Sequence, residues 1–217
     1  MQFDIITIFP ELFTPFISTS VIKKAISKKI ITINIHNLRD YTTLKHNKVD
    51  DTAYGGGVGM ILMAEPIINA VKAIKDKKKK NHVILVSLSD NFFNQKKAIT
   101  YAKNFDQIIL ICGRYEGVDE RVKQTVVDET ISIGEYVLTG GELASMVIVD
   151  ATSRMVSGFF NKDEVLNNES YLKGKIIEHP QYTKPKIVEG IEVPPVLLSG
   201  NHKEIKKWKE KHQKTFN

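Results

Sequence analysis

Two segments combine glycines with charged and aromatic side chains directly after apolar runs. The first, Gly113 to Gly117, follows Ile108 to Ile111, and the second, Gly134 to Gly141, follows Thr130 to Ile133. Each pattern predicts a strand that ends in a glycine-containing turn, where free backbone N–H and C=O groups can bind a ligand. The simpler alternative is that these glycines serve only tight turns. The two segments therefore predict either a ligand site or two sharp connections.

Composition limits the classes of protein that this chain can represent. Its 217 residues are enough for one large domain or two small ones, and 42% of them are hydrophobic. The single cysteine excludes an internal disulfide framework and fits a reducing, cytoplasmic location. No stretch approaches the roughly 18 consecutive apolar residues of a membrane helix, so we expect no membrane partner. The net charge of +6 fits a polyanionic partner such as nucleic acid, but it also fits a surface that is simply rich in lysine.

The pattern along the chain predicts alternating strands and helices, which indicates an α/β fold with a mainly parallel sheet flanked by helices. We expect a long loop over Leu38 to Met60. The expected strands are Phe3 to Ile8, Ile30 to Ile35, Val83 to Val86, Ile108 to Ile111 and Asp128 to Ile133. The expected helices are Glu11 to Lys28, Glu65 to Ile74, Gln95 to Asn104, a helix near Glu116 to Gln124, and Gly141 to about Val156.

A loss of pattern divides the chain into two predicted domains. Residues 159–169 are polar and without period, and we interpret them as a flexible linker after an α/β domain of residues 1–158. Residues 170–217 are basic and rich in proline, with an amphipathic stretch around Ile205 and Trp208. We expect them to form a small, mostly helical C-terminal domain.

Several motifs in a fixed order relate the chain to a known family. They are the two segments above, Asp50 to Met60, Pro180 to Pro185 and Val193 to His202. Together they make the chain resemble the bacterial tRNA (guanine-N1-)-methyltransferases, a family in the SPOUT superfamily of knotted RNA methyltransferases. The resemblance runs from Phe3 to about Trp208 and implies a deep trefoil knot in the α/β domain. Such knots are rare exceptions to the usual rules of chain topology.

The resemblance implies that S-adenosylmethionine is bound by three loops at the knot. Two departures from the family pattern fall in these loops: Asp90-Asn91-Phe92 stands where Pro-Gln-Gly is usual, and Ala144 replaces a proline. The residues that the resemblance assigns to cofactor binding are Leu88, Ser89, Gly113, Tyr115, Glu116, Gly117, Ser132, Ile133, Gly134, Tyr136, Leu138, Gly140 and Gly141.

Two side chains are candidates for the methyl transfer itself. Guanine N1 carries a proton, so a carboxylate placed against it can act as a general base. The resemblance assigns this base to Glu169, where the family usually has aspartate, and assigns stabilisation of the guanine oxygen to Arg154. The alternatives are a solvated or capping Glu169 and a surface ion pair for Arg154.

The implied partners are tRNA and a second copy of the chain. The resemblance predicts a homodimer whose active site is shared between subunits, and a target guanosine immediately 3′ of the anticodon in a subset of tRNAs. A glycine-rich loop allows close approach of a base, and an aspartate can accept hydrogen bonds from guanine. The candidate tRNA contacts are His46, Lys48, Asp50, Gly55, Gly56, Gly57, Gly59 and Ser170.

The sequence also bears on metal binding and on two alternative functions. The six histidines show no ligand spacing, so we expect no protein metal site, although the resemblance makes magnesium possible. The departures at Asp90 to Phe92, Ala144 and Glu169 leave open an RNA-binding protein that has lost turnover. A nucleotide hydrolase is disfavoured because the glycine loop lacks the lysine of a phosphate-binding loop.

Overall fold

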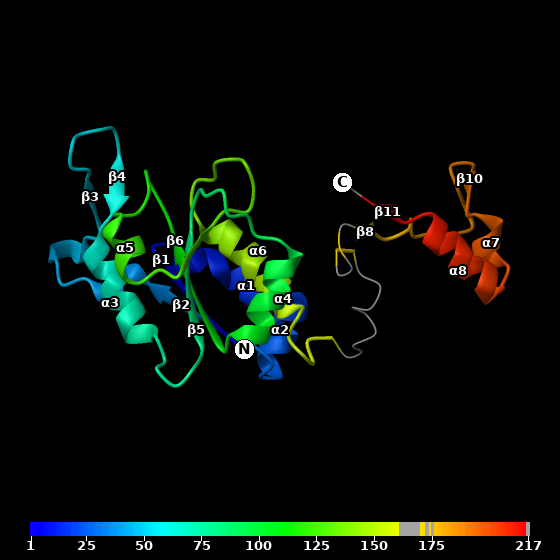
Figure 1. The fold of residues 1–217 in the computed structure, drawn as a ribbon, viewed down its shortest axis with the longest axis horizontal. Coiled ribbons are helices and arrows are strands. Elements are labelled where there is room, and N and C mark those ends of the chain that lie inside the picture. Colours follow the sequence, from blue (N-terminus) through cyan, green and yellow to red (C-terminus); the bar gives the residue numbers. More distant parts are fainter. Residues whose placement is uncertain (161–169, 172–173, 175, 216–217) are drawn as a thin grey trace. The chain divides into compact units, whose positions relative to one another are not determined.

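The computed structural model describes residues 1–160, 170–171, 174 and 176–215. The chain divides into two compact units, residues 1–160 and 161–217 (Figure 1). The first unit is a layered α/β domain, and the second is a small assembly of short strands and helices. The predicted linker, 159–169, falls largely outside the described residues, so its proposed role stays a prediction.

A five-stranded parallel sheet forms the centre of the first unit. The strands lie in the order β2-β1-β6-β5-β7, and every neighbouring pair is parallel. Strands β1, β5 and β6 are largely buried because both faces of the parallel sheet are covered. The five strands are β1 (Gln2–Thr7), β2 (Thr32–Asn37), β5 (Asn81–Val86), β6 (Gln107–Cys112) and β7 (Glu129–Ile131).

Helices cover both faces of this sheet, as the sequence predicts. Side chains alternate along each strand, so Phe3 and Ile5 enter one core while Ile6 and Val83 enter the other. On one face lie α1 (Thr14–Ser18), α2 (Ser20–Ser27), α4 (Gln95–Asn104) and α6 (Glu142–Ser153), and on the other α3 (Ala64–Ile74) and α5 (Arg121–Thr125) (Figure 1). The prediction of a mainly parallel α/β sheet flanked by helices is thus confirmed.

The structure corrects three predicted elements, and the first is a helix. The helix expected over Glu11 to Lys28 is broken into a 3₁₀ turn (Pro10–Phe13), α1 and α2. The break lies at Thr19, which is extended, and Ser20, whose φ of 56° is incompatible with a continuous helix. Apolar spacing continues across this break, so periodicity alone does not reveal it.

The long loop expected over Leu38 to Met60 contains regular structure. It holds two 3₁₀ turns (Leu38–Tyr41 and Lys45–Asn47) and the antiparallel hairpin of β3 (Asp50–Thr52) and β4 (Met60–Leu62). The hairpin strands have only three residues each, which is too short for an alternating pattern to stand out. The helix predicted near Glu116 to Gln124 is also shorter than expected, because it begins only at Arg121.

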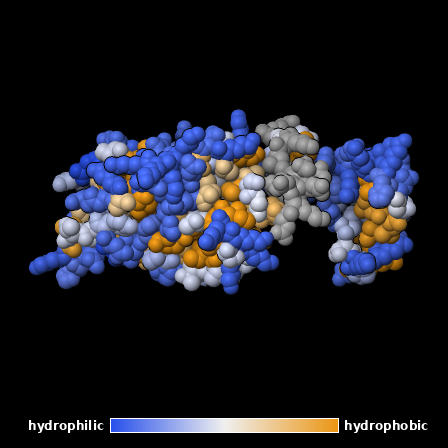
Figure 2. All heavy atoms as spheres, turned by 90° about the horizontal axis from the view of Figure 1, so that it is seen from below, coloured by the Kyte–Doolittle hydropathy of each residue, from blue (hydrophilic) through white to orange (hydrophobic). Residues whose placement is uncertain are grey.

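The second unit combines short strands with two helices. Its elements are β8 (Ile176–Ile177), β9 (Ile187–Val188), β10 (Ile191–Glu192), α7 (Pro195–Leu198), α8 (His202–Lys211) and β11 (Lys214–Thr215). Strands β9 and β10 form a hairpin, and β11 pairs with β8. Trp208 of α8 contacts the rings of His179, Tyr182 and His212, so it belongs to the packing of this unit. Figure 2 shows apolar patches on the surface of each unit.

Candidate active site

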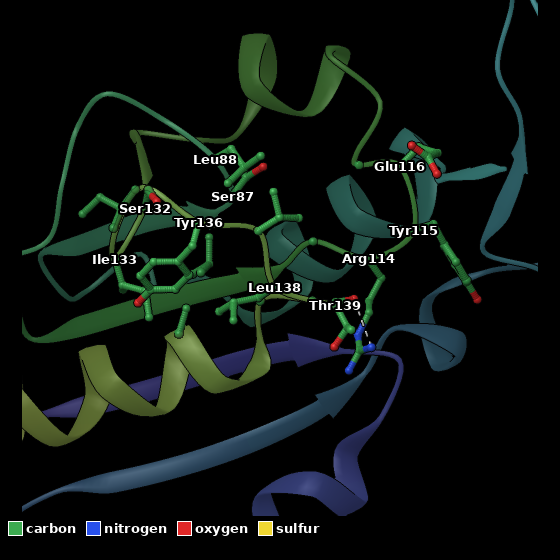
Figure 3. A pocket seen from close by; sticks show the side chains of 18 residues that line it. Ser87, Leu88, Arg114, Tyr115, Glu116, Ser132, Ile133, Tyr136, Leu138 and Thr139 are labelled. Atoms are coloured by element: carbon green, nitrogen blue, oxygen red, sulfur yellow. Dashed lines mark hydrogen bonds between the residues drawn. The ribbon is translucent and has the colours of Figure 1, made fainter. Parts of the chain in front are cut away.

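A cavity of about 240 Å³ lies where three neighbouring strands of the sheet end. Its walls come from the loops that follow β5, β6 and β7, together with the start of α6 (Figure 3). Ser87 and Leu88 belong to the first loop, Arg114 to Glu116 to the second, and Ser132 to Gly141 to the third. The carboxyl ends of parallel strands meet at one edge of a sheet, and this edge is the common ligand site of such folds.

Most of the residues assigned to the cofactor lie in this cavity. Ser89 and Gly134 are not among the lining residues, and the other eleven of the thirteen candidates are. Those eleven are Leu88, Gly113, Tyr115, Glu116, Gly117, Ser132, Ile133, Tyr136, Leu138, Gly140 and Gly141. The cavity also includes residues that the sequence analysis did not assign: Val86, Ser87, Arg114, Ile131, Val137, Thr139 and Ala144.

Gly141 brings the third loop into direct contact with the sheet. Its N–H donates to the carbonyl oxygen of Gly113 at 2.9 Å. A Cβ at this position would lie 2.9 Å from Cα of Cys112 and 3.1 Å from the carbonyl oxygen of Val86. Because these neighbours are backbone atoms, no side-chain rotation can relieve the overlap. A residue without a side chain is therefore needed where the three loops meet.

The thiol of Cys112 lies beneath this contact and is 2% exposed. Burial raises the pKa of the thiol, the charge of Glu142 raises it further, and the hydroxyl of Ser145, 3.2 Å from the sulfur, acts in the opposite direction. The group is therefore a neutral packing side chain at the end of β6 rather than a nucleophile.

Arg114 is the main charged group of the wall that sequence analysis missed. Its Nε donates to Glu142 at 2.9 Å and its Nη1 to the carbonyl oxygen of Thr139 at 3.1 Å, which joins the second loop to the third (Figure 3). Glu142 is 1% exposed and also accepts from the hydroxyl of Thr7. The guanidinium carbon lies 4.6 Å from the ring centre of Phe9. The adjacent Gly113-Arg114 pair in the first glycine segment was the available signal in the sequence, but its partner Glu142 is 28 residues away.

Side chains rather than backbone surround the other two glycines of the third loop. A Cβ on Gly140 would overlap the side chain of Arg114, and a Cβ on Gly134 would overlap the ring of Tyr136. Tyr136 is 53% exposed, and its ring lies on the same side of the cavity as Ile133 and Leu138 (Figure 3). An open, largely apolar wall of this kind suits the flat face of a heterocycle.

The glycine-rich hairpin turn adjoins the second loop of the cavity. The N–H of Glu116 donates to the carbonyl oxygen of Met60 at 3.0 Å, and Leu62 forms a parallel bridge with Val118. A Cβ on Gly59 would lie 2.7 Å from Cγ of Glu116, so the turn passes directly over this cavity residue. The hairpin that carries the candidate tRNA contacts is therefore attached to the candidate cofactor site.

The candidate tRNA contacts of the first unit cluster on this hairpin and the turn before it. Asp50 begins β3, and Gly55, Gly56, Gly57 and Gly59 all have positive φ values between its two strands. Lys48 pairs with Asp51 at 2.8 Å, and His46 lies exposed in the preceding 3₁₀ turn. Ser170 belongs to the second unit, where its hydroxyl accepts from the N–H of Glu178 at 3.0 Å.

Of the two candidate catalytic residues, only Arg154 lies among the described residues. Glu169 lies outside the described residues. Arg154 follows the last residue of α6, and its guanidinium carbon lies 4.8 Å from the ring centre of Phe160. Helix α6 begins at the cavity and has 12 residues, so Arg154 is roughly 18 Å along the helix axis from the cavity of its own chain. Burial raises the pKa of Asp150, one turn earlier, while the charge of Arg154 lowers it.

The described residues show neither a cluster of metal-binding side chains nor a membrane-spanning helix. They contain no group of three or more histidine, cysteine, aspartate or glutamate side chains that could hold a metal ion. Within the same part of the chain, none of the helices has the length and apolar character needed to cross a membrane.

The parallel sheet and the glycine-lined cavity at its carboxyl edge define an α/β protein with a small-molecule pocket at the edge where such sheets bind their ligands. The family model described as tRNA (Guanine-1)-methyltransferase TrmD matches residues 1–216. A protein of Carboxydothermus hydrogenoformans is 50% identical over 97% of this chain and 82% of its own length. One of Dictyoglomus turgidum is 51% identical over 100% of this chain and 87% of its own. Both are named tRNA (guanine-N(1)-)-methyltransferase.

The chain belongs to the tRNA (guanine-1)-methyltransferase family. This membership confirms the resemblance drawn from the motifs and identifies the chain as a tRNA-modifying methyltransferase. It also agrees with the predicted class of enzyme, an S-adenosylmethionine-dependent tRNA (guanine-N1-)-methyltransferase. Family membership does not assign roles to individual side chains.

Proposed function

We propose that the cavity binds S-adenosylmethionine and that the enzyme methylates N1 of the guanosine immediately 3′ of the anticodon in a subset of tRNAs. The observation that carries this proposal is the meeting of three loops, two of them rich in glycine, at the carboxyl ends of β5, β6 and β7. When bound, this ligand supplies an electrophilic methyl group on a sulfonium. Backbone groups around Gly140 and Gly141 can read an adenine edge, and Tyr136 and Leu138 offer apolar surface to its faces.

In the proposed reaction, the guanine is positioned by the hairpin turn next to the cavity. Gly59 and Glu116 are in contact range, so a base held by the turn faces the cavity mouth. The Glu169 carboxylate takes the N1 proton as the methyl–sulfur bond breaks and the methyl–N1 bond forms. The Arg154 guanidinium stabilises the negative charge that develops on the guanine oxygen. His46, Lys48 and Ser170 contact the RNA backbone in this arrangement.

We further propose that the active site is shared between two subunits. Arg154 sits at the opposite end of α6 from the cavity of its own chain, so it can serve a cavity only through a second copy. Leu143 and Val147 of α6 are 61% and 47% exposed, and they lie on the same side of the helix as Arg154. An apolar stripe that leads to a functional arginine fits the contact between two copies.

The proposed chain topology is the trefoil knot. The contacts that support it join loops from three successive strands: Ser132 bridges to Phe92, and Gly140 bridges to Arg114. The chain after β7 therefore crosses the end of β5 and reaches the end of β6 before α6 begins. Such a return path is what a threaded segment requires.

The reaction is tested with labelled S-adenosylmethionine and two matched tRNA transcripts, which carry guanosine or adenosine at the target position. We expect label only in the guanosine transcript, and its loss in Glu169→Gln. Label that persists in this variant would assign the base elsewhere, with Asp50 as the next candidate. No label with either transcript from a folded dimer would favour a protein that binds RNA without turnover.

The shared site is tested by mixing two inactive variants. Arg154→Ala removes the arginine, and Leu138→Glu places a charge in the cavity wall. In a mixed dimer, one site combines an intact cavity with an intact arginine, so random mixing restores about a quarter of wild-type activity. No recovery after verified exchange of subunits would show that Arg154 and the cavity act within one chain.

A further inference from the structure

A polar cluster lies at the edge of the sheet, beside the cavity but not in its wall. It centres on Glu129 of the edge strand β7, whose side chain is 17% exposed. Four donors converge on its carboxylate: Asn91 at 2.8 Å, His82 at 2.9 Å, the hydroxyl of Tyr101 at 2.5 Å, and Lys97. They come from the first loop, from β5 and from α4, so one carboxylate joins three elements to the edge strand.

Burial alone would raise the pKa of Glu129, but the hydrogen bonds from His82, Lys97, Tyr101 and Asn91 outweigh it and hold the pKa at about 2. The carboxylate is therefore charged at neutral pH and accepts all four hydrogen bonds. Hydrogen bonds to a charged acceptor are roughly twice as strong as those between neutral groups.

Asn91 is the member of this cluster that leads to the cavity. Its side-chain amide donates to Glu129 and to the carbonyl oxygen of Thr130 at 3.0 Å. The main-chain carbonyl oxygen of Asn91 accepts a hydrogen bond from the N–H of Ser132 at 3.2 Å. The main-chain N–H of Asn91 donates to the hydroxyl of Ser89 at 3.0 Å. Ser132 lines the cavity, and Ser89 follows Leu88, which lines it too. Asn91 thus holds two cavity loops at once.

The first loop has few other attachments near the cavity. Ser87 donates to Ile131 at 3.0 Å, and Phe93 donates to Ser132 at 2.8 Å. Between these two anchors, Leu88 is 61% exposed and Asp90 is also exposed. The position of Leu88 and Ser89 is therefore set largely by Asn91, and the orientation of Asn91 is set by Glu129.

We infer that Glu129 is a positioning residue for the methyl-donor cavity, acting through Asn91 on the first and third loops. Glu129 is not among the residues that line the cavity. This inference rests on the proposal that the cavity binds S-adenosylmethionine. A loosened first loop lowers the affinity for this ligand, while the transfer step at saturation depends on other groups.

The test compares variants that remove different hydrogen bonds to the same carboxylate. Asn91→Ala removes the one that leads to the cavity, and Tyr101→Phe removes one that leads only to α4. Glu129→Gln keeps the shape of the side chain but turns half of its acceptors into a donor, so it remains informative if Asn91→Ala folds poorly. Leu138→Glu, in the cavity wall, reports separately on the cavity itself. Calorimetry measures the Kd for S-adenosylmethionine, steady-state kinetics measures kcat and both KM values, and thermal unfolding measures stability.

We expect Asn91→Ala and Glu129→Gln to raise the Kd and KM for S-adenosylmethionine about tenfold, with kcat and the KM for tRNA within about twofold of wild type. Tyr101→Phe is expected to lower the melting temperature and leave that Kd unchanged. Equal Kd values for Asn91→Ala, Tyr101→Phe and wild type would overturn the inference and leave the cluster a purely structural one. Wild-type affinity in Leu138→Glu would instead refute the proposed cofactor cavity.

Discussion

Replacement of Gly141 by alanine tests the contact that closes the cavity. The new Cβ would lie 2.9 Å from Cα of Cys112, 3.0 Å from the nitrogen of Gly113 and 3.1 Å from the carbonyl oxygen of Val86. All three are backbone atoms of β5, β6 or the loop after β6, and these strands are buried on both faces. Relief therefore requires the third loop to move away from the sheet.

The size of the effect follows from this geometry. Overpacking a well-ordered site typically costs about 1–3 kcal/mol. In a chain of about 200 residues each kcal/mol changes the melting temperature by about 2–4 °C, so we expect a decrease of roughly 2–12 °C. Moving the loop also disturbs the hydrogen bond from Gly141 to Gly113, so the Kd for S-adenosylmethionine is expected to rise at least about tenfold.

Gly134→Ala is the matched control in the same loop. Its Cβ would lie 2.2 Å from the ring of Tyr136, which is closer than any contact at Gly141. Tyr136 is half exposed, so its side chain can rotate away, and we expect a change in stability within about 0.5 kcal/mol. Calorimetric unfolding and titration with S-adenosylmethionine measure both variants. A Gly141→Ala protein with the melting temperature of wild type would refute the reasoning. A Gly134→Ala protein that is destabilised as much as Gly141→Ala would refute it too.

Three further outcomes are expected. Glu129 has its pKa lowered from 4.5 to about 2, so its stabilising contribution is complete above about pH 4.5 and is lost as the pH falls towards 2. Urea unfolding should therefore show the stability difference between wild type and Glu129→Gln shrinking across this window, and a constant difference would contradict it. Arg114→Met leaves the buried Glu142 without its ion pair and should lower the free energy of unfolding by about 3–5 kcal/mol. Lys48→Met removes an exposed ion pair and should lower it by less than about 1 kcal/mol in the same urea assay. The buried thiol of Cys112, with its raised pKa, should react with a thiol reagent only at the rate of unfolding, and rapid labelling of the native protein would disprove its burial.

The sequence by itself determined the class of fold and the position of two of the three loops that line the cavity. Continuous apolar runs such as Ile108 to Ile111 are long enough to indicate strands covered on both faces. A glycine directly after two of them indicated where the chain must turn tightly. These are local signals, because they depend on residues that are neighbours along the chain. The ordered motifs then sufficed to identify the family.

These local signals do not detect short elements. The three-residue strands of the β3–β4 hairpin carry too few positions for a period, and the break at Ser20 leaves the apolar spacing intact. The sequence analysis therefore described one as a loop and the other as part of a helix.

Tertiary structure alone decided which distant residues meet. The order β6-β5-β7 brings the loops after three strands to one edge, although the strands follow one another differently along the chain. The pairing of Arg114 with Glu142 spans 28 residues, and that of Asn91 with Glu129 spans 38. Such contacts arise from strand order and from the packing of helices on the sheet, and no pattern of neighbouring residues encodes them. The same packing separates Arg154 from the cavity of its own chain, which is why the proposed active site takes residues from two subunits.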